Sequence, residues 1–222
     1  MKNLLAFDIE TTGLDYCQHD IVSLALVPID GAQREKFGIL ELYHEPFCGL
    51  YAWDDWARNN FEEHIRDTWE DEKIDSATLA TRLESYIEKF DDGHPGSDKV
   101  TLVGHNVGSF DIPFLKALYT HYIQNLFPAS TQLFPTAISY RSVDTHSLLY
   151  SLYARGHIPA DACSSSGAFK FFGIEVPQGR RHTAGGDAIA TAELYKRIIE
   201  FEEPETSCPC DCNYCQFCTE NL

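Results

Sequence analysis

The chain has 222 residues, of which 44% are hydrophobic and 23% are charged, and its formal net charge at pH 7 is −17. This length and apolar content suit one α/β domain with a sizeable core. The acidic excess argues against a protein that coats nucleic acid through a basic surface. The acidic excess does not exclude an enzyme whose active site binds cations.

The sequence also predicts a cytoplasmic protein with no membrane partner. No run of eighteen or more apolar residues is present, as a membrane-spanning helix would need. The first ten residues lack the apolar core and cleavage site of a secretory signal. Five of the eight cysteines fall in the last fifteen residues, so we do not expect the disulfide framework of a small secreted domain.

Three strands are expected first. Residues 3–9 form a short buried strand, residues 20–30 a second and residues 35–45 a third, with "DGAQ" as the hairpin turn between the last two. Residues 54–90 are predicted to be helical, because apolar side chains recur at helical spacing after Ser76, a plausible N-cap.

Strands and helices then alternate. A strand at 99–106 precedes a helix at 111–126 with a proline in its first turn. A strand at 138–145 leads to helices around "HSLLYSLYA" and "SSSGAFKFFGI", and "AGGDAIATAELYKRIIEFEE" forms a long amphipathic helix. This order predicts an α/β fold, a five-stranded mixed sheet with helices on both faces. Residues 1–203 form the expected domain, and residues 204–222 a Cys-rich tail.

Two acids close the first strand, in "LLAFDIETTGLD". Alternate strand residues face the same side, so Asp8 and Glu10 project together while Ile9 points away. Two carboxylates this close cannot both stay ionised in a low-dielectric site unless a cation joins them or one takes up a proton. Magnesium and manganese are the natural cations for such ligands. Taken alone, the stretch is equally compatible with a solvated pair of acids at a strand edge.

Two further stretches place acids where helices begin. In "LVGHNVGSFDIPFL", Asp111 follows a strand and a glycine loop and opens a helix, where the helix dipole alone could stabilise its charge. In "GRRHTAGGDAIATAELY", His182 lies in a loop and Asp187 lies near the start of a helix. Seen alone, these two could be an exposed loop histidine and a helix-capping acid.

Together the three stretches resemble the DEDDh family of 3′–5′ exonucleases, the DnaQ-like group on the ribonuclease-H-like fold. The first motif of the family, D-x-E-T-T-G, is matched by Asp8, Glu10, Thr11, Thr12 and Gly13. The second, H-N-x-x-x-F-D, is matched by His105, Asn106, Phe110 and Asp111, and the third, H-x-x-x-x-D, by His182 and Asp187. The motifs occur in the family's order, and the resemblance covers about residues 3 to 200.

The resemblance implies hydrolysis of nucleic acid from the 3′ end, with release of nucleoside 5′-monophosphates. Four carboxylates would hold two Mg²⁺ or Mn²⁺ ions: Asp8, Glu10, Asp111 and Asp187. Asp8 would bridge the two ions, and His182 would take the proton from the attacking water. A neutral imidazole suits that task, because its unperturbed pKa of about 6.5 lies near the working pH.

The family pattern also implies contacts with the terminal nucleotide. These would come from Thr11, Thr12, Gly13 and Leu14, for which an ordinary strand-to-loop turn is the alternative, and from Asn106. Arg180 and Arg181 could grip substrate phosphates or be a solvated loop pair. The tryptophans at positions 53, 56 and 69 could stack on bases, but helical packing is the favoured interpretation.

The expected partner is a single-stranded nucleic-acid 3′ end, DNA rather than RNA, as in DNA repair or replication. One alternative is an exoribonuclease, because "YHEPFCGL" weakly resembles ribonuclease T-like members of the family. Another is an accessory module that binds nucleic acid without catalysis. The full set of four acids and a histidine argues against that module. The acidic balance predicts a short substrate footprint with modest salt dependence.

The tail is a separate feature. Its cysteines include C-x-x-C spacing, which suits a tetrahedral thiolate site for Zn²⁺, and they are Cys208, Cys210, Cys212, Cys215 and Cys218. A flexible tail that oxidises on handling is the alternative. The acidic tail could also recruit a protein partner.

Overall fold

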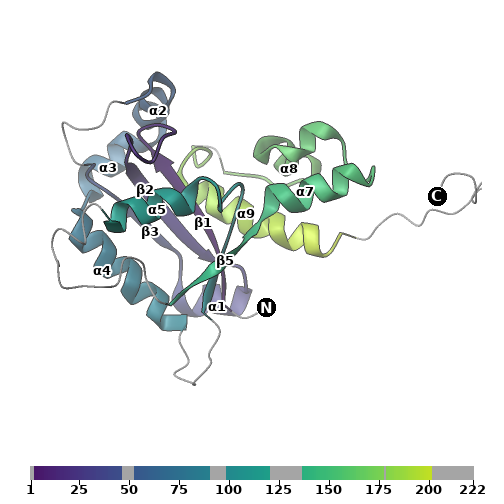
Figure 1. Cartoon of the computed structure of the whole chain (residues 1–222), viewed down its shortest axis with the longest axis horizontal. Coiled ribbons are helices and arrows are strands. Elements are labelled where there is room, and N and C mark those ends of the chain that lie inside the picture. Colours follow the sequence, from purple (N-terminus) through teal and green to yellow (C-terminus); the bar gives the residue numbers. More distant parts are fainter. Residues whose placement is uncertain (1–2, 47–52, 91–98, 121–136, 178, 202–222) are drawn as a thin grey trace, which may run out of the picture.

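The structure, a computed structural model, describes residues 3–46, 53–90, 99–120, 137–177 and 179–201 (Figure 1). Five strands form one sheet in the order β3-β2-β1-β4-β5. They are β1 Leu4–Thr11, β2 Ile21–Pro28, β3 Leu40–Tyr43, β4 Val100–Gly104 and β5 Ile138–Asp144. Strand β2 pairs antiparallel with β1 and β3, whereas β4 pairs in parallel with both β1 and β5. The sheet is therefore mixed, as predicted.

The helices of the described residues are α1 Gly31–Phe37, α2 Asp55–Asn60, α3 Arg66–Glu72, α4 Ser76–Ile87, α5 Asp111–Leu118, α7 Thr145–Ala154, α8 Ser165–Phe171 and α9 Ala184–Ile199. A π-helix, Phe61–Ile65, joins α2 to α3, and short 3-10 helices lie at Glu88–Phe90 and Ala160–Cys163. Among the described helices, none is long and apolar enough to cross a membrane.

The two faces of the sheet carry different cores. Leu5, Phe7 and Ile9 of β1 pack in the larger core, together with buried side chains of α4 and α5. Ala6 faces the other way, against a column of small residues on α9, Ala184, Ala188 and Ala192. These small side chains let α9 approach β1 and β2 closely. The prediction of helices on both faces is confirmed.

The predicted "DGAQ" hairpin turn is wrong, because this segment starts helix α1. The carboxylate of Asp30 caps the helix by accepting a hydrogen bond from the backbone N–H of Gln33 at 2.9 Å. The helix ends at Gly38, whose φ of 73° favours glycine. The third strand therefore begins at Leu40 rather than at residue 35.

The predicted helical region 54–90 is interrupted. Ile74 leaves the helical path and forms a β-bridge with His44, which separates α3 from α4. The N-cap of α4 is Asp75 rather than Ser76, since its carboxylate accepts a hydrogen bond from the N–H of Thr78 at 2.8 Å.

Some predictions fall outside the described residues. The helix predicted at 111–126 is present as α5, and its predicted second half includes residues that are not described. The Cys-rich tail, its zinc site and the domain boundary at residues 203 and 204 also lie there, so all three stay predictions.

Candidate active site

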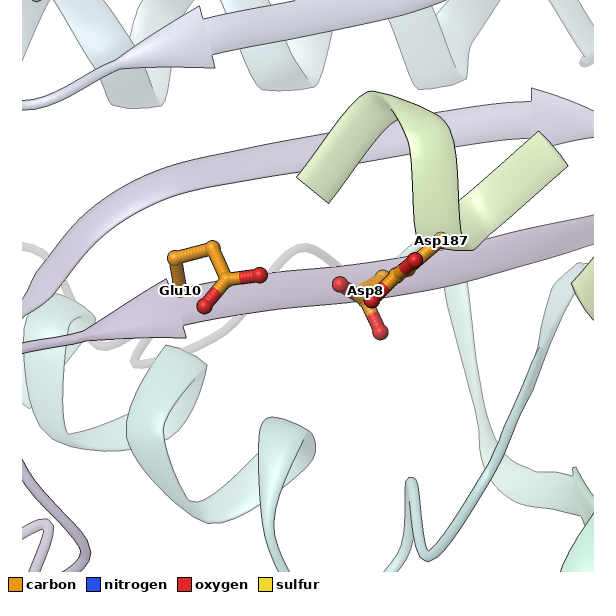
Figure 2. A group of neighbouring side chains, drawn as sticks. All are labelled: Asp8, Glu10 and Asp187. Carbon is orange, nitrogen blue, oxygen red and sulfur yellow. The ribbon is translucent and has the colours of Figure 1, made fainter. Parts of the chain in front are cut away.

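Three carboxylates meet where β1 passes beneath the start of α9 (Figure 2). Asp8 and Glu10 come from β1, Asp187 comes from α9, and each offers an oxygen that lies within 4.8 Å of the others. The strand's alternation puts both β1 acids on the face that α9 covers, while Ile9 points into the opposite core. The predicted pair of Asp8 and Glu10 is thus joined by a third acid, Asp187, which lies 177 residues after Glu10 in the chain.

The turn before α9 fixes Asp187. Thr183 caps the helix through its hydroxyl, which accepts a hydrogen bond from the N–H of Gly186 at 3.1 Å. A Cβ on Gly186 would lie 1.7 Å from the carbonyl oxygen of Arg180, so only glycine lets the turn fold over the helix. Asp187 then lies in the first turn of α9, where the helix dipole favours an anion.

The fourth predicted acid, Asp111, lies beside this group of three rather than within it. It is 4% exposed at the start of α5, and its carboxylate accepts a hydrogen bond from the backbone N–H of Ile9. Among the neighbouring charges, that of Asp111 contributes most to the raised pKa of Asp8.

Loss of water and mutual repulsion dominate the electrostatics of the acids. Burial, and then the charges of Asp111, Asp187 and Glu10, hold the pKa of Asp8 well above its usual range. Burial and the charge of Asp187 do the same to the pKa of Glu10. Burial raises the pKa of Asp111 to about 8. A bound cation would relieve this repulsion.

The donor set fits a divalent cation. One oxygen of Asp187, Oδ1, is buried and has no hydrogen-bond partner among the described residues. An unsatisfied buried carboxylate oxygen is costly, and here it lies beside two further carboxylates. Several carboxylate oxygens and no sulfur or imidazole ligand suit Mg²⁺ or Mn²⁺.

Arg180 and Arg181 are both engaged inside the protein. Arg181 pairs with Oδ2 of Asp187, donates to the hydroxyls of Ser165 and Ser166, and lies 5.2 Å from the ring centre of Phe169. Arg180 pairs with Glu41 on β3 at 2.9 Å. Both arginines therefore fasten the loop that precedes α9, and the predicted phosphate contact of Arg181 stays a prediction.

His182 lies in that loop with a φ of 61°, in the left-handed region that few non-glycine residues adopt. Its ring centre lies 6.0 Å from that of Trp56 and 6.1 Å from that of His64. Partial burial, followed by the charge of Arg181, lowers the pKa of His182. The imidazole is therefore neutral at pH 7 and can accept a proton.

Asn60, at the end of α2, is a site residue that sequence analysis missed. Its side-chain amide is buried and donates to Oε2 of Glu10 at 3.1 Å and to the carbonyl oxygen of His182 at 3.3 Å. It thus links a carboxylate of the acidic group to the backbone of the histidine loop. Trp56, on the same helix, is 63% exposed beside His182 and does not pack in a core as its helical position suggested.

The loop after β1 presents some of the predicted nucleotide contacts and buries others. Leu14 is 73% exposed. Thr12 is fully buried, and its hydroxyl accepts a hydrogen bond from the N–H of Asp20 at 3.0 Å, so its role here is to shape the loop. The hydroxyl of Thr11 donates to the carbonyl oxygen of Gly13 at 2.6 Å.

Asn106 has an exposed side chain and a φ of 62°, a backbone conformation that asparagine tolerates better than most residues. Its N–H donates to Oδ1 of Asp144 at 3.1 Å, which ties the end of β4 to the end of β5.

The fold is the ribonuclease-H-like fold, and similar solved structures are those of exonuclease I. One such structure shares 18% identity with a TM-score of 0.64, over 90% of this chain and 41% of its own. E. coli exonuclease I in complex with a dT13 oligonucleotide shares 18% identity with a TM-score of 0.63, over 89% of this chain and 41% of its own. A product-bound exonuclease I shares 17% identity with a TM-score of 0.63, over 90% of this chain and 43% of its own.

The chain therefore spans about two fifths of the length of these exonuclease I chains. No family model matches the sequence, and no curated protein is similar to it. The similarity establishes the fold, and membership of the DEDDh subtype stays a prediction from the three sequence motifs.

Proposed function

We propose that the protein is a metal-dependent 3′–5′ exonuclease that acts on single-stranded DNA ends and releases nucleoside 5′-monophosphates. The observation that carries the proposal is the meeting of Asp8, Glu10 and Asp187 within 4.8 Å, next to the loop that holds His182. The three sequence motifs and the likeness to exonuclease I, which has been solved with a dT13 oligonucleotide, support the same activity.

In the proposed mechanism, Asp8, Glu10 and Asp187, with the neighbouring Asp111, would hold two Mg²⁺ or Mn²⁺ ions. Such ions, when bound, lower the pKa of a water and stabilise negative charge on the leaving 3′ oxygen. The imidazole of His182, which is neutral at pH 7, accepts a proton at a ring nitrogen. Backbone groups of Thr11 and Gly13, together with the exposed side chain of Leu14, hold the terminal nucleotide.

The test compares the purified full chain with its Asp8→Ala variant on single-stranded DNA, duplex DNA and single-stranded RNA, in Mg²⁺ and in Mn²⁺. We expect mononucleotides to be released from single-stranded DNA, and we expect the variant to be slower by about 10³-fold, because the acidic group loses a central ligand. Asp67→Ala, an exposed acid on α3, is the matched control and should keep full activity. Full activity of Asp8→Ala, or internal cleavage products, would contradict the proposal.

Substitution of Asn60 tests its role as a positioning residue. Asn60→Ala is expected to lower kcat by about 10- to 100-fold, because it removes a hydrogen bond to the Glu10 carboxylate and frees the His182 loop. Asn60→Asp should lower it further, since another negative charge would then face Glu10. The neighbouring Asn59 is exposed, so Asn59→Ala is the matched control. A kcat that Asn60→Ala leaves unchanged, with an unchanged Mn²⁺ affinity, would refute this role.

A further inference from the structure

A row of aromatic rings runs from the end of β4 along α7. His105 lies at the end of β4, and its ring centre is 5.4 Å from that of His146 at the start of α7. The ring of His146 is stacked near that of Tyr150, with 6.3 Å between centres, and Tyr153 follows at 5.8 Å. The four rings form a continuous series, which we call the α7 aromatic row.

The α7 members of the row share one exposed face of the helix. Positions 146, 150 and 153 are spaced by four and three residues, which places them above one another. Tyr150 is 56% exposed and Tyr153 is 40% exposed. The buried face of the helix is formed by other residues, Leu149 and Leu152, so packing of α7 does not account for the row.

The row is tied to the loop between β4 and α5, which leads to Asp111. The hydroxyl of Thr145 lies 3.3 Å from Nδ1 of His105. Asp144 accepts hydrogen bonds from the N–H of Asn106 at 3.1 Å and from the N–H of His146 at 2.9 Å. One carboxylate thus ties the loop of the second motif to the first turn of α7. In Figure 1, α7 extends from this end of β5 away from the sheet.

The sequence that contains the α7 part of the row differs in charge from the chain as a whole. Residues 138–157 contain Arg141 and Arg155 and a single acid, Asp144, although the chain carries a formal net charge of −17. Ser147 and Ser151 are exposed on α7, next in sequence to His146 and Tyr150, and their hydroxyls can donate to phosphate oxygens. Positive charge, hydroxyl donors and exposed rings together complement a single strand of nucleic acid.

We propose that the α7 aromatic row is the track for the nucleotides on the 5′ side of the bond to be cleaved, with their bases stacked on its rings. The inference rests on the proposed function and adds to it how the strand is held. A helix rises about 1.5 Å per residue, so the row from 146 to 153 spans about 10 Å, the length of roughly three stacked nucleotides. Stacking tolerates every base, so the track would select single strands and not sequences. Such a track would also explain how a chain with a formal net charge of −17 could bind a negatively charged strand.

Binding is measured in the full-length Asp8→Ala background by fluorescence anisotropy, with oligothymidylates of two to eight nucleotides. We expect Tyr150→Ala together with Tyr153→Ala to weaken binding of the eight-nucleotide strand at least about tenfold. The loss should shrink as the strand shortens and no longer reaches the row. Tyr150→Phe with Tyr153→Phe should restore binding, because phenylalanine keeps the stacking surface. Phe171→Ala removes an exposed aromatic side chain of α8, outside the row, and should leave binding unchanged.

Two outcomes would overturn the track. Alanine variants that bind the eight-nucleotide strand as tightly as their parent would exclude base stacking on α7 and leave the row to another partner, such as a protein. An equal loss with Phe171→Ala would show that exposed aromatic side chains act without regard to position. Cleavage of the p-nitrophenyl ester of thymidine 5′-phosphate by the wild type, compared with Asp8→Ala, tests the catalytic proposal separately. This ester does not extend along α7, so either proposal can fail while the other stands.

Discussion

Replacing Asp111 by asparagine is expected to stabilise the protein in EDTA at pH 8 and to remove most of its exonuclease activity. Asp111 is almost fully buried, and burial raises its pKa to about 8. In the unfolded chain an aspartate has a pKa of about 3.9. The folded protein therefore binds this proton more tightly than the unfolded chain, and the acid destabilises the fold wherever it must ionise.

The sign of the pH dependence follows from this difference. Between about pH 4 and pH 8, folding takes up a proton at Asp111, so the free energy of unfolding falls as the pH rises through that window. One proton corresponds to about 1.4 kcal/mol per pH unit. His105 acts in the opposite direction at lower pH, because burial lowers its pKa to about 4. The decline is therefore clearest between about pH 6.5 and pH 8.

The measurement is thermal unfolding in EDTA from pH 5.5 to pH 8.5. Asp111→Asn should show a smaller decline of Tm with pH and a higher Tm at pH 8, whereas Asp67→Asn, at an exposed position, should match the wild type. In Mg²⁺ the exonuclease rate of the same Asp111 variant should be lower by about 10³-fold, because a carboxylate that would help to hold the cations is removed. A variant that is less stable than the wild type at pH 8 would contradict the proposed cost of this buried acid.

This cost also explains why the acids were identifiable from the sequence. Carboxylates at the end of an apolar strand and at helix starts conflict with burial, and such conflicts are expected at functional sites. The pairing of Asp8 with Glu10 followed from strand alternation alone. The position of Asp111 outside the group of three depends on how α5 packs against the sheet, which no local pattern encodes.

Contacts between distant segments account for what sequence analysis missed. Asn60 lies 50 residues from Glu10 and 122 from His182, and a lone asparagine at a helix end carries no sign of either partner. The sequence alone does not pair Arg180 with Glu41, because the two residues are 139 positions apart. A phosphate contact therefore remained open for this arginine. Helix α1 is different, since Asp30 and Gly38 are local capping signals that the hairpin interpretation overlooked.

His182→Asn is expected to lower kcat by about 10²- to 10⁴-fold, the contribution of a positioned general base. Asparagine suits the test because the backbone of His182 has a φ of 61°, a conformation that asparagine adopts with less strain than most residues. The fold should be kept, as a Tm close to that of the wild type would show. Mn²⁺ binding, measured by calorimetry, should also be unchanged, because the cations are assigned to the carboxylates.

The pH profile of kcat separates a base from a merely structural histidine. Burial and the charge of Arg181 lower the pKa of His182, so the wild type should gain activity as the pH rises through a value below about 6.5, and His182→Asn should lack this acidic limb. The matched control is His64→Asn, whose ring also lies 6.1 Å from His182. It should keep the limb and move it to higher pH, because the charge of His64 contributes to the lowered pKa of His182. An acidic limb that survives in His182→Asn would assign the proton transfer to another group, and a lost affinity for Mn²⁺ would make His182 a support for the acidic site.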